Sequence, residues 1–141
     1  MNETIKILIA DDEKSILLSL KSYLKKKGYE VFTAEDGDAA LEFIKSNRID
    51  FLLTDFRMPG KNGFELLAEV KKFNPNIEVV VITAFGTIED AVKFMKEGAY
   101  NYLTKPIDLD ELDLLLARMA ERKLLLDENR ELKKKLENRF R

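Results

Sequence analysis

Three aspartates follow two apolar runs of the sequence, and their placement is the first sign of chemistry. Asp11 and Asp12 come directly after the run 5–10, and Asp55 comes directly after the run 51–54. Both runs have the length and composition of buried strands in a parallel sheet. In such sheets the carboxyl ends of the central strands open onto the crevice where ligands bind. We therefore expect the three carboxylates to lie together at one edge of the sheet.

Carboxylates held close together require positive charge beside them. At a separation of about 4 Å, each pair repels by about 4 kcal/mol when the effective dielectric constant is about 20. The chain can supply Lys105, which follows the strand-like segment 100–104, and a divalent cation is the second candidate. The sequence therefore predicts an acidic site that is neutralised by a lysine, a metal ion or both.

Length and composition predict a single domain with an appendage, located in the cytoplasm. The 141 residues can build one core. Lys and Arg total 24 against 26 Asp and Glu, so at a net charge of −2 we expect no direct contact of this chain with nucleic acid or membrane. The sequence has no cysteine, no signal-like segment and no apolar run of about 18 residues.

The absence of histidine excludes several classes of enzyme. A Ser-His-Asp or Cys-His nucleophile system, a zinc site of the usual histidine type and an internal phosphohistidine all require that residue. Any phosphohistidine donor must therefore belong to another protein. A P-loop pattern is absent as well, so the sequence has no visible site for nucleotide hydrolysis.

The order of apolar segments predicts an α/β fold with five parallel strands and five helices. Each of the first four helices carries an apolar stripe that we expect to face the core. The stripes are Ile16, Leu20 and Leu24; Ala40, Phe43 and Ile44; Leu66, Val70 and Phe73; and Ile88, Ala91, Val92 and Met95. The expected strands are residues 5–10, 30–34, 51–54, 78–83 and 100–104.

The last predicted helix is too long for one small domain. It begins after Pro106 and Asp108, meets no breaker, and could extend for about 48 Å over about 32 residues. Leu109, Leu112, Leu116 and Met119 would suit packing on the sheet. We therefore place a domain at residues 1–122 and a helical linker at 123–141.

The linker carries a second stripe with the spacing of a coiled coil. Leu125, Asn129, Leu132 and Leu136 fall at the d, a, d and a positions of a heptad, with Glu128 at g and Lys133 at the following e. This pattern favours a parallel two-stranded coil and therefore a homodimer. Only two heptads carry it, and Arg118 and Arg122 would occupy core positions upstream, so a solvated helix or a simple linker is the alternative.

Four short motifs at the predicted strand ends together resemble a response-regulator receiver domain. They are Asp11-Asp12, Asp55 before Met58-Pro59-Gly60, Thr83-Ala84, and Lys105-Pro106. The resemblance covers roughly residues 4–120. It implies a flavodoxin-like, doubly wound sheet in the order 2-1-3-4-5.

The resemblance implies that Asp55 accepts a phosphoryl group from a sensor histidine kinase. Asp12 and Asp55 would bind Mg²⁺ directly, with the backbone carbonyl of Arg57 as a further ligand, and Asp11 would act through water or hydrogen bonds. Oxygen ligands of this kind suit magnesium. The chemistry would be self-phosphotransfer and self-dephosphorylation, without turnover of an external substrate.

The resemblance also implies a switch. Lys105 would bridge to Asp55 and then to the phosphoryl group, while Thr83 would hydrogen-bond that group and move with the aromatic side chain of Tyr102. The surface of helix four, strand five and helix five would change as a result. Simpler interpretations exist for each residue: a helix cap for Asp11-Asp12, a strand end for Thr83, a solvated lysine, and an ordinary half-buried aromatic for Tyr102.

Two further positions bear on the lifetime of the phosphorylated state. Arg57 and Phe85 lie two residues beyond Asp55 and Thr83, where receivers tune dephosphorylation. A bulky Phe85 could restrict the attacking water, so we expect slow self-hydrolysis.

Segments 83–91 and 98–103 resemble receivers of the nitrogen regulatory protein C type, which usually precede an ATPase that activates sigma-54 transcription. This resemblance implies downstream ATPase and DNA-binding domains in a longer protein, with the linker carrying the dimer. A free-standing receiver is one alternative, and a dimerising scaffold with a relic pocket is another. A Mg²⁺-dependent aspartyl phosphatase of the haloacid dehalogenase type is disfavoured, because it would need a second aspartate where Arg57 stands.

Overall fold

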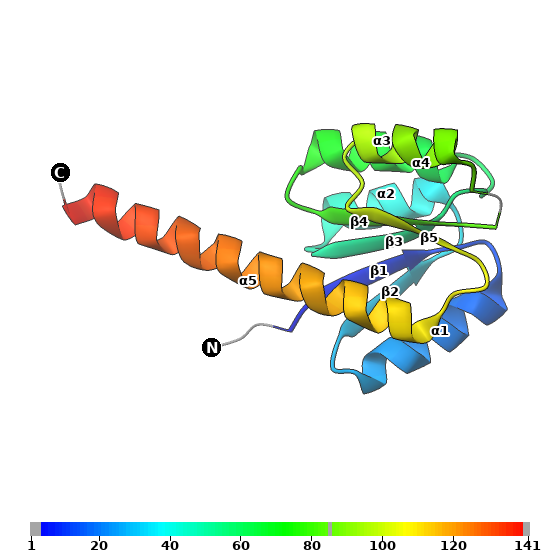
Figure 1. The fold of residues 1–141 in the computed structure, drawn as a ribbon, viewed down its shortest axis with the longest axis horizontal. Coiled ribbons are helices and arrows are strands. Elements are labelled where there is room, and N and C mark those ends of the chain that lie inside the picture. The colour runs from blue at the N-terminus through cyan, green and yellow to red at the C-terminus, as the bar shows by residue number, and fades with distance from the viewer. Residues whose placement is uncertain (1–3, 85, 140–141) are drawn as a thin grey trace. The chain divides into compact units, whose positions relative to one another are not determined.

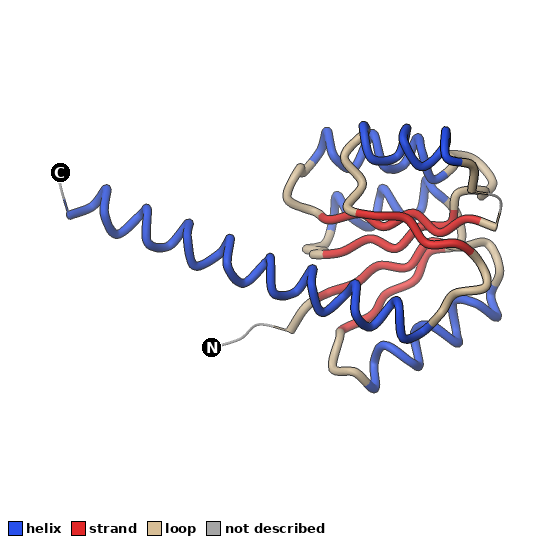
Figure 2. Tube along the Cα trace, viewed as in Figure 1, coloured by secondary structure: helices blue, strands red, loops and turns tan. Residues whose placement is uncertain are grey.

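The computed structural model describes residues 4–84 and 86–139, and it contains the α/β fold that the sequence predicts. Five parallel strands form one sheet in the order β2-β1-β3-β4-β5. Figures 1 and 2 show α1 on one face of this sheet and α2, α3 and α4 on the other. The elements are β1 (Lys6–Ala10), α1 (Lys14–Lys26), β2 (Glu30–Ala34), α2 (Gly37–Ser46), β3 (Phe51–Asp55), α3 (Gly63–Phe73), β4 (Glu78–Thr83), α4 (Ile88–Lys96), β5 (Asn101–Thr104) and α5 (Leu109–Arg139).

The helices begin and end at signals that are visible in the sequence. Asn62 and Glu65 form a capping box at the start of α3, which satisfies two of the free amide groups there. Gly28 and Gly98 follow α1 and α4 with φ of 98° and 104°, a left-handed conformation that glycine adopts without a steric penalty. These signals mark the start of α3 and the ends of α1 and α4.

The core between the sheet and α2, α3 and α4 is built from aliphatic side chains of the central strands. Leu8, Leu52 and Val79 are fully buried, and Leu66 and Val70 of α3 are buried with them. A strand that is buried on both faces reads as a continuous apolar run, which is why β1, β3 and β4 are recognisable in the sequence. The predicted stripes of α1, α2 and α3 are largely correct, although Phe73 at the end of α3 is 48% exposed.

The predicted core face of α4 is correct for Ala91 and wrong for its other three residues. Ile88, Val92 and Met95 are 84%, 45% and 46% exposed, whereas Ala91 and Phe94 are the buried residues of this helix. The ring centroid of Phe94 lies 5.3 Å from that of Phe56 and 6.4 Å from that of Phe64. The apolar residues of α4 lie on two adjacent faces. Helical periodicity alone therefore could not show which of these faces packs against the core.

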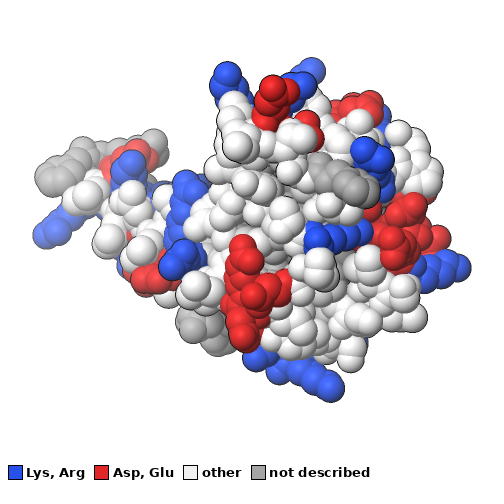
Figure 3. Space-filling view, turned by 45° about the vertical axis from the view of Figure 1, so that its right-hand side comes forward, with Lys and Arg blue, Asp and Glu red and all other residues white. Residues whose placement is uncertain are grey.

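The chain divides into two compact units, Met1–Pro106 and Ile107–Arg141. The second unit consists mainly of α5, whose 31 residues correspond to about 46 Å of helix. Leu112, Leu115, Leu116 and Met119 are its buried residues, whereas Leu125, Leu132 and Leu136 are more than half exposed. No helix in the described ranges is long and apolar enough to cross a membrane. On the surface drawn in Figure 3, acidic and basic side chains are interspersed among uncharged areas.

Candidate functional site

The ends of four strands bring the predicted site residues to one edge of the sheet. Asp11 directly follows β1, Asp55 and Thr83 are the last residues of β3 and β4, and Lys105 directly follows β5. Asp55 pairs in register with Ile82, the residue before Thr83. Parallel pairing therefore places all four residues at the carboxyl edge, as the sequence predicts.

Three carboxylates gather at this edge. One carboxylate oxygen from each of Asp11, Asp12 and Asp55 lies within 4.8 Å of the others. Asp11 and Asp55 are 3% and 8% exposed, whereas Asp12 faces solvent. Two of these charged groups are therefore removed from water and depend on neighbouring protein groups or a bound cation for compensation.

Lys105 supplies the positive charge. Its Nζ lies 3.3 Å from Asp11 Oδ2 and 3.3 Å from Asp55 Oδ1. Its backbone amide donates to the carbonyl of Thr83 over 2.8 Å, and the Lys105-Pro106 peptide bond is cis. Burial opposes the charge of the ammonium group, but Asp11 and Asp55 together raise the pKa of Lys105. We call Asp11, Asp12, Asp55 and Lys105 the carboxyl-edge site.

The pKa of Asp55 is raised above its usual value. Burial is the largest cause and the negative charge of Asp11 is the next, while Lys105 acts in the opposite direction. The single lysine therefore does not fully compensate two buried carboxylates. An additional cation at the site would favour the ionised form of Asp55, which is the form that can act as a nucleophile.

Asp11 is held in place by the backbone around it. Its Oδ1 accepts a hydrogen bond from the amide of Glu13 over 2.9 Å, and its own amide donates to the carbonyl of Ala34 over 3.1 Å. Glu13 is the N-cap residue of α1 and makes no side-chain cap bond. The Asp11-Asp12 pair therefore does not act as the usual helix cap, which was the simpler interpretation of these residues.

Two residues that support the position of Asp55 were not recognised in the sequence. A Cβ atom on Gly63 would lie 2.5 Å from the carbonyl oxygen of Asp55, so only glycine allows α3 to start this close to the end of β3. The hydroxyl of Thr54 donates to the same carbonyl over 3.0 Å. The sequence gives only a weak signal for this role of Gly63.

The loop between β3 and α3 is also held by ion pairs to two neighbouring helices. Lys61 Nζ lies 3.3 Å from Glu69 Oε1 on α3 and 3.7 Å from Asp38 Oδ1 on α2. Arg57, whose backbone carbonyl is the predicted fourth metal ligand, lies in this loop with an exposed side chain. The loop that would complete a metal site is therefore anchored to two helices.

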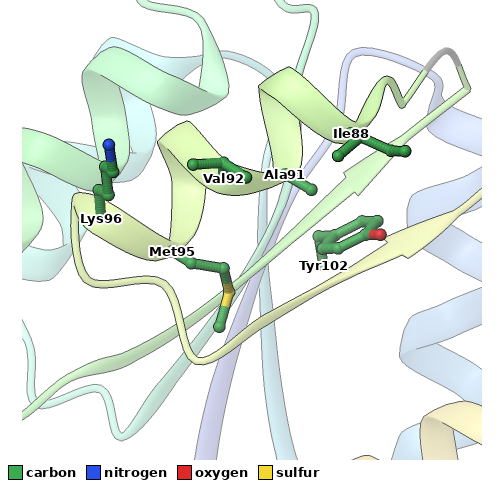
Figure 4. A pocket seen from close by; sticks show the side chains of 6 residues that line it. All are labelled: Ile88, Ala91, Val92, Met95, Lys96 and Tyr102. Atoms are coloured by element: carbon green, nitrogen blue, oxygen red, sulfur yellow. The ribbon is translucent and has the colours of Figure 1, made fainter.

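Thr83 and Tyr102 lie near each other in the sheet register but in different surroundings. Thr83 is 4% exposed and pairs with Thr104, two residues beyond Tyr102 on β5. Tyr102 is half-buried and lines an open groove of about 410 Å³ with five residues of α4, namely Ile88, Ala91, Val92, Met95 and Lys96. Figure 4 shows the Tyr102 ring beneath Ile88 and Ala91. We call this the α4–β5 groove. Phe85, the second predicted determinant of dephosphorylation, lies outside the described residues.

The chain matches the family of response regulator receiver domains over residues 7–117. It belongs to this family. The receiver is 41% identical to the transcriptional regulatory protein ZraR of Klebsiella oxytoca over 82% of its own length and 26% of that protein. It is 38% identical to sporulation initiation phosphotransferase F of Bacillus subtilis strain 168, over 79% of its own length and 89% of that protein.

A solved structure shares the arrangement of the elements. The solution structure of the beryllofluoride-activated NtrC4 receiver domain dimer has a TM-score of 0.79 and 33% identity, covering 84% of this chain and 98% of that one. The chain thus spans about a quarter of the ZraR protein and nearly all of the two smaller relatives. The receiver family and the strand order inferred from the four motifs are confirmed.

Proposed function

We propose that this receiver is a phosphorylation switch of a two-component system, in which Asp55 accepts a phosphoryl group from a phosphohistidine of a sensor histidine kinase. A carboxylate oxygen of Asp55 attacks phosphorus, the phosphorus–nitrogen bond breaks, and its electron pair returns to the imidazole of the kinase. The observation that carries the proposal is the carboxyl-edge site, where three carboxylates and one lysine meet in a member of the receiver family.

The residues present fit a magnesium ion. Carboxylate oxygens of Asp11, Asp12 and Asp55 are hard ligands within a few ångströms of one another, one of them faces solvent, and the ion normally keeps several waters. We propose that Asp12 and Asp55 bind it directly, that Asp11 acts through water, and that the carbonyl of Arg57 adds a ligand. The ion would supply positive charge beside the transferred phosphoryl oxygens.

Lys105 and Thr83 have separate parts in the proposal. Lys105, already 3.3 Å from Asp55, would follow the negative charge from the carboxylate to the phosphoryl oxygens. Thr83, at the end of the neighbouring strand, would donate its hydroxyl to the phosphoryl group and adjust β4 and the segment after it. The transfer adds about −1.5 to −2 charges at a site that is already acidic, which supplies the driving force for rearrangement.

The exposed apolar face of α4 supports the surface of α4 and β5 as part of the output of the switch. Ile88 and Met95 are exposed and line the α4–β5 groove together with Tyr102. A shift of Thr83 on β4 would also affect Tyr102 on β5, because the two strands are paired and Tyr102 lies opposite Val81. We propose that this surface and the pairing of α5 into a coiled coil control dimer state and a downstream ATPase with DNA-binding domains.

A second candidate is a free-standing receiver that acts by binding partners. The chain covers 89% of sporulation initiation phosphotransferase F, a protein of nearly the same extent as the receiver itself. The 31-residue length of α5 favours the first candidate, since a helix of about 46 Å can reach well beyond one small domain. Phosphatase activity on external substrates is not favoured, because Arg57 stands where an acid/base aspartate would be needed.

The proposal is tested by phosphorylation with a small phosphoryl donor and Mg²⁺, read by intact mass. The wild-type chain should gain one phosphoryl group, Asp55→Asn should gain none, and Asp12→Asn should gain it only slowly. Asp90→Asn, on α4, is the matched control and should label like the wild type. Labelling of Asp55→Asn to the wild-type extent would overturn the assignment, and continuous release of phosphate from the donor without a labelled protein would indicate a hydrolase.

Light scattering with Mg²⁺ and beryllofluoride, a mimic of the aspartyl phosphate, tests the assembly step. A change in mass or shape that is absent in Asp55→Asn would support a switch acting through the dimer. No change in either protein, despite bound mimic, would contradict control of dimerisation and favour a switch that acts through partner binding.

A further inference from the structure

Four of the exposed leucines of α5 lie on one continuous face that begins earlier than the predicted coiled coil. Leu125, Leu132 and Leu136 are 58%, 59% and 53% exposed, and Leu114, eleven residues before Leu125, is 54% exposed. At 3.6 residues per turn, eleven residues correspond to three turns and about 20°. Leu114, Leu125 and Leu136 therefore follow one another along the same side of the helix.

The heptad register does not extend to this region. Moving back from Leu125 in heptad steps leads to Arg122, Arg118 and Leu115 at the core positions. Leu115 is only 6% exposed, so its side chain is already enclosed and unavailable to a partner helix. An 11-residue repeat instead leads from Leu125 through Glu121 and Arg118 to Leu114, which is exposed.

The charges between the leucines also favour the 11-residue repeat. In the heptad register the two core residues in this stretch are Arg118 and Arg122, which would place four like charges at the seam of a dimer. In the 11-residue register they are Arg118 and Glu121, which have opposite signs and are three residues apart. Arg118 of each helix can then pair with Glu121 of the other helix. The repulsion between arginines that the heptad register would produce is thereby avoided.

Between residues 123 and 130, the side of α5 opposite this face is occupied by ion pairs within the helix. Lys123 Nζ lies 2.6 Å from Asp127 Oδ2, and Arg130 lies 3.6 Å from Asp127. These three residues are about 140–200° around the helix from Leu125. A polar side opposite an apolar stripe is the pattern of a helix that packs on one partner.

We propose that two copies of this chain pair in parallel through a face of α5 that begins at Leu114 and follows an 11-residue repeat to Leu136. The inference rests on the proposed dimer and deepens it, because it assigns the residues and the geometry of the pairing. The face runs for about 33 Å, and a repeat of 3.67 residues per turn gives nearly straight helices with a slight right-handed twist. The proposed pairing therefore differs from a heptad coiled coil, which would be left-handed and confined to the linker.

A second copy in parallel orientation is the occupant that fits best. Parallel pairing places Asn129 against Asn129 and lets Arg118 meet Glu121 of the second copy. Antiparallel pairing centred on Leu125 would instead place Arg118 against Leu132 and bury a charge against an apolar side chain. Glu128 and Lys133 flank the seam and can pair across it in the parallel arrangement.

The chain contains no cysteine, so single cysteines report the register directly. We would oxidise Glu121→Cys, Arg122→Cys, Asn129→Cys and Glu131→Cys variants of the 141-residue chain with Mg²⁺, with and without beryllofluoride. Disulfide-linked dimer is scored in whichever condition links Asn129→Cys more. Asn129 lies at the seam in both registers and Glu131 on the outside in both, so they are the positive and negative controls.

The proposal expects Glu121→Cys to cross-link to about the extent of Asn129→Cys, with Arg122→Cys at the Glu131→Cys background. The reverse result would overturn it in favour of the heptad. Cross-linking of Asn129→Cys alone would also overturn it, because pairing would then be confined to the linker while the proposed dimer survived. If Asn129→Cys fails and light scattering shows a dimer, the helices are not parallel; if it shows only monomer, the proposed dimer itself is wrong.

A second pair of variants tests the upstream end of the face without cysteine. Leu114→Ala should weaken the dimer at least about tenfold, because two leucine side chains lose their packing. Leu109→Ala is the matched control: Leu109 is also exposed, at 41%, but lies about 160° away from Leu125. Equal dissociation constants for the two variants would place Leu114 outside the interface and overturn the proposal.

Discussion

The carboxyl-edge site and the α4–β5 groove place side chains in opposite kinds of unfavourable surroundings. Asp11 and Asp55 are charged groups that are removed from water, whereas Ile88, Val92 and Met95 are apolar groups left in water. The first arrangement needs positive charge nearby, and the second gains free energy when another surface covers it. Neither arrangement is expected where only the stability of the fold matters.

The two regions differ in how far the protein compensates them itself. Lys105 contacts both buried carboxylates, so the carboxyl-edge site is partly neutralised before any ion or phosphoryl group arrives. The α4–β5 groove is open among the described residues. The comparison indicates that the carboxyl-edge site is largely preorganised, whereas the α4–β5 groove would be compensated only when another surface covers it.

The largest expected effect contrasts the two faces of α4. Phe94→Ala should lower the free energy of unfolding by about 3–5 kcal/mol, because its ring is 2% exposed and packs against Phe56 and Phe64. Met95→Ala, one residue further along the helix, should change it by less than about 0.5 kcal/mol, because its side chain is exposed. Urea unfolding at low protein concentration measures both values. Equal losses would show that the α4 face is covered in the free protein.

The fold and the centre of the site were predictable for the same physical reason. Strands buried on both faces are continuous apolar runs, so the residues that follow them, such as Asp11, Asp55 and Lys105, are located as soon as the runs are recognised. The motif order then added the strand order 2-1-3-4-5. These features depend on the local sequence and on parallel topology, and neither requires knowledge of side-chain packing.

The features that were missed depend on distances between elements. Gly63 is needed because α3 starts in close contact with the carbonyl oxygen of Asp55. The short distance between these two backbone segments cannot be predicted from the local sequence. Whether Phe94 or Met95 is buried in the core depends on the space between α4 and the sheet, which helical periodicity does not predict. Leu114 was overlooked because the heptad from Leu125 passes through Leu115, and only the observed burial separates the two.

Removal of the lysine should have the next largest effect. Lys105→Met leaves Asp11 and Asp55 without their common partner, and we expect a loss of about 2–4 kcal/mol in the free energy of unfolding at neutral pH. The loss should be smaller by more than about 1 kcal/mol when Asp55→Asn is already present, because only one carboxylate is then abandoned. A double-mutant cycle by urea unfolding without Mg²⁺ measures this coupling. Strict additivity would show that Lys105 does not compensate Asp55.

Magnesium should stabilise the carboxyl-edge site by a smaller amount. At a concentration ten times its dissociation constant, an ion that binds only the folded protein adds about 1.4 kcal/mol. Asp12→Asn should remove most of this gain with little cost to the apo protein, because Asp12 is exposed. Thermal unfolding with and without Mg²⁺ measures the gain, and Glu42→Gln on α2 is the matched control. An equal gain in Asp12→Asn would exclude Asp12 as a ligand.

The smallest expected effect is the dependence of stability on pH at Asp55. Burial and Asp11 raise the pKa of this carboxyl above its ordinary value of 3.8, which we take for the unfolded state. The folded state therefore binds the proton more tightly than the unfolded state does. The stabilising effect of that proton is fully present below 3.8 and is lost as the pH rises through the raised pKa. The effect should be small, because Lys105 opposes the shift.

The wild type and Asp55→Asn isolate this dependence when both are unfolded with urea at several pH values. Without Mg²⁺, the wild type should lose stability relative to Asp55→Asn as the pH rises from 3.8 through the raised pKa. Saturating Mg²⁺ should reverse the slope, because the ion favours the ionised carboxylate. The opposite slope in the absence of Mg²⁺ would mean that Lys105 outweighs burial, and the carboxyl-edge site would then be fully compensated without any added cation.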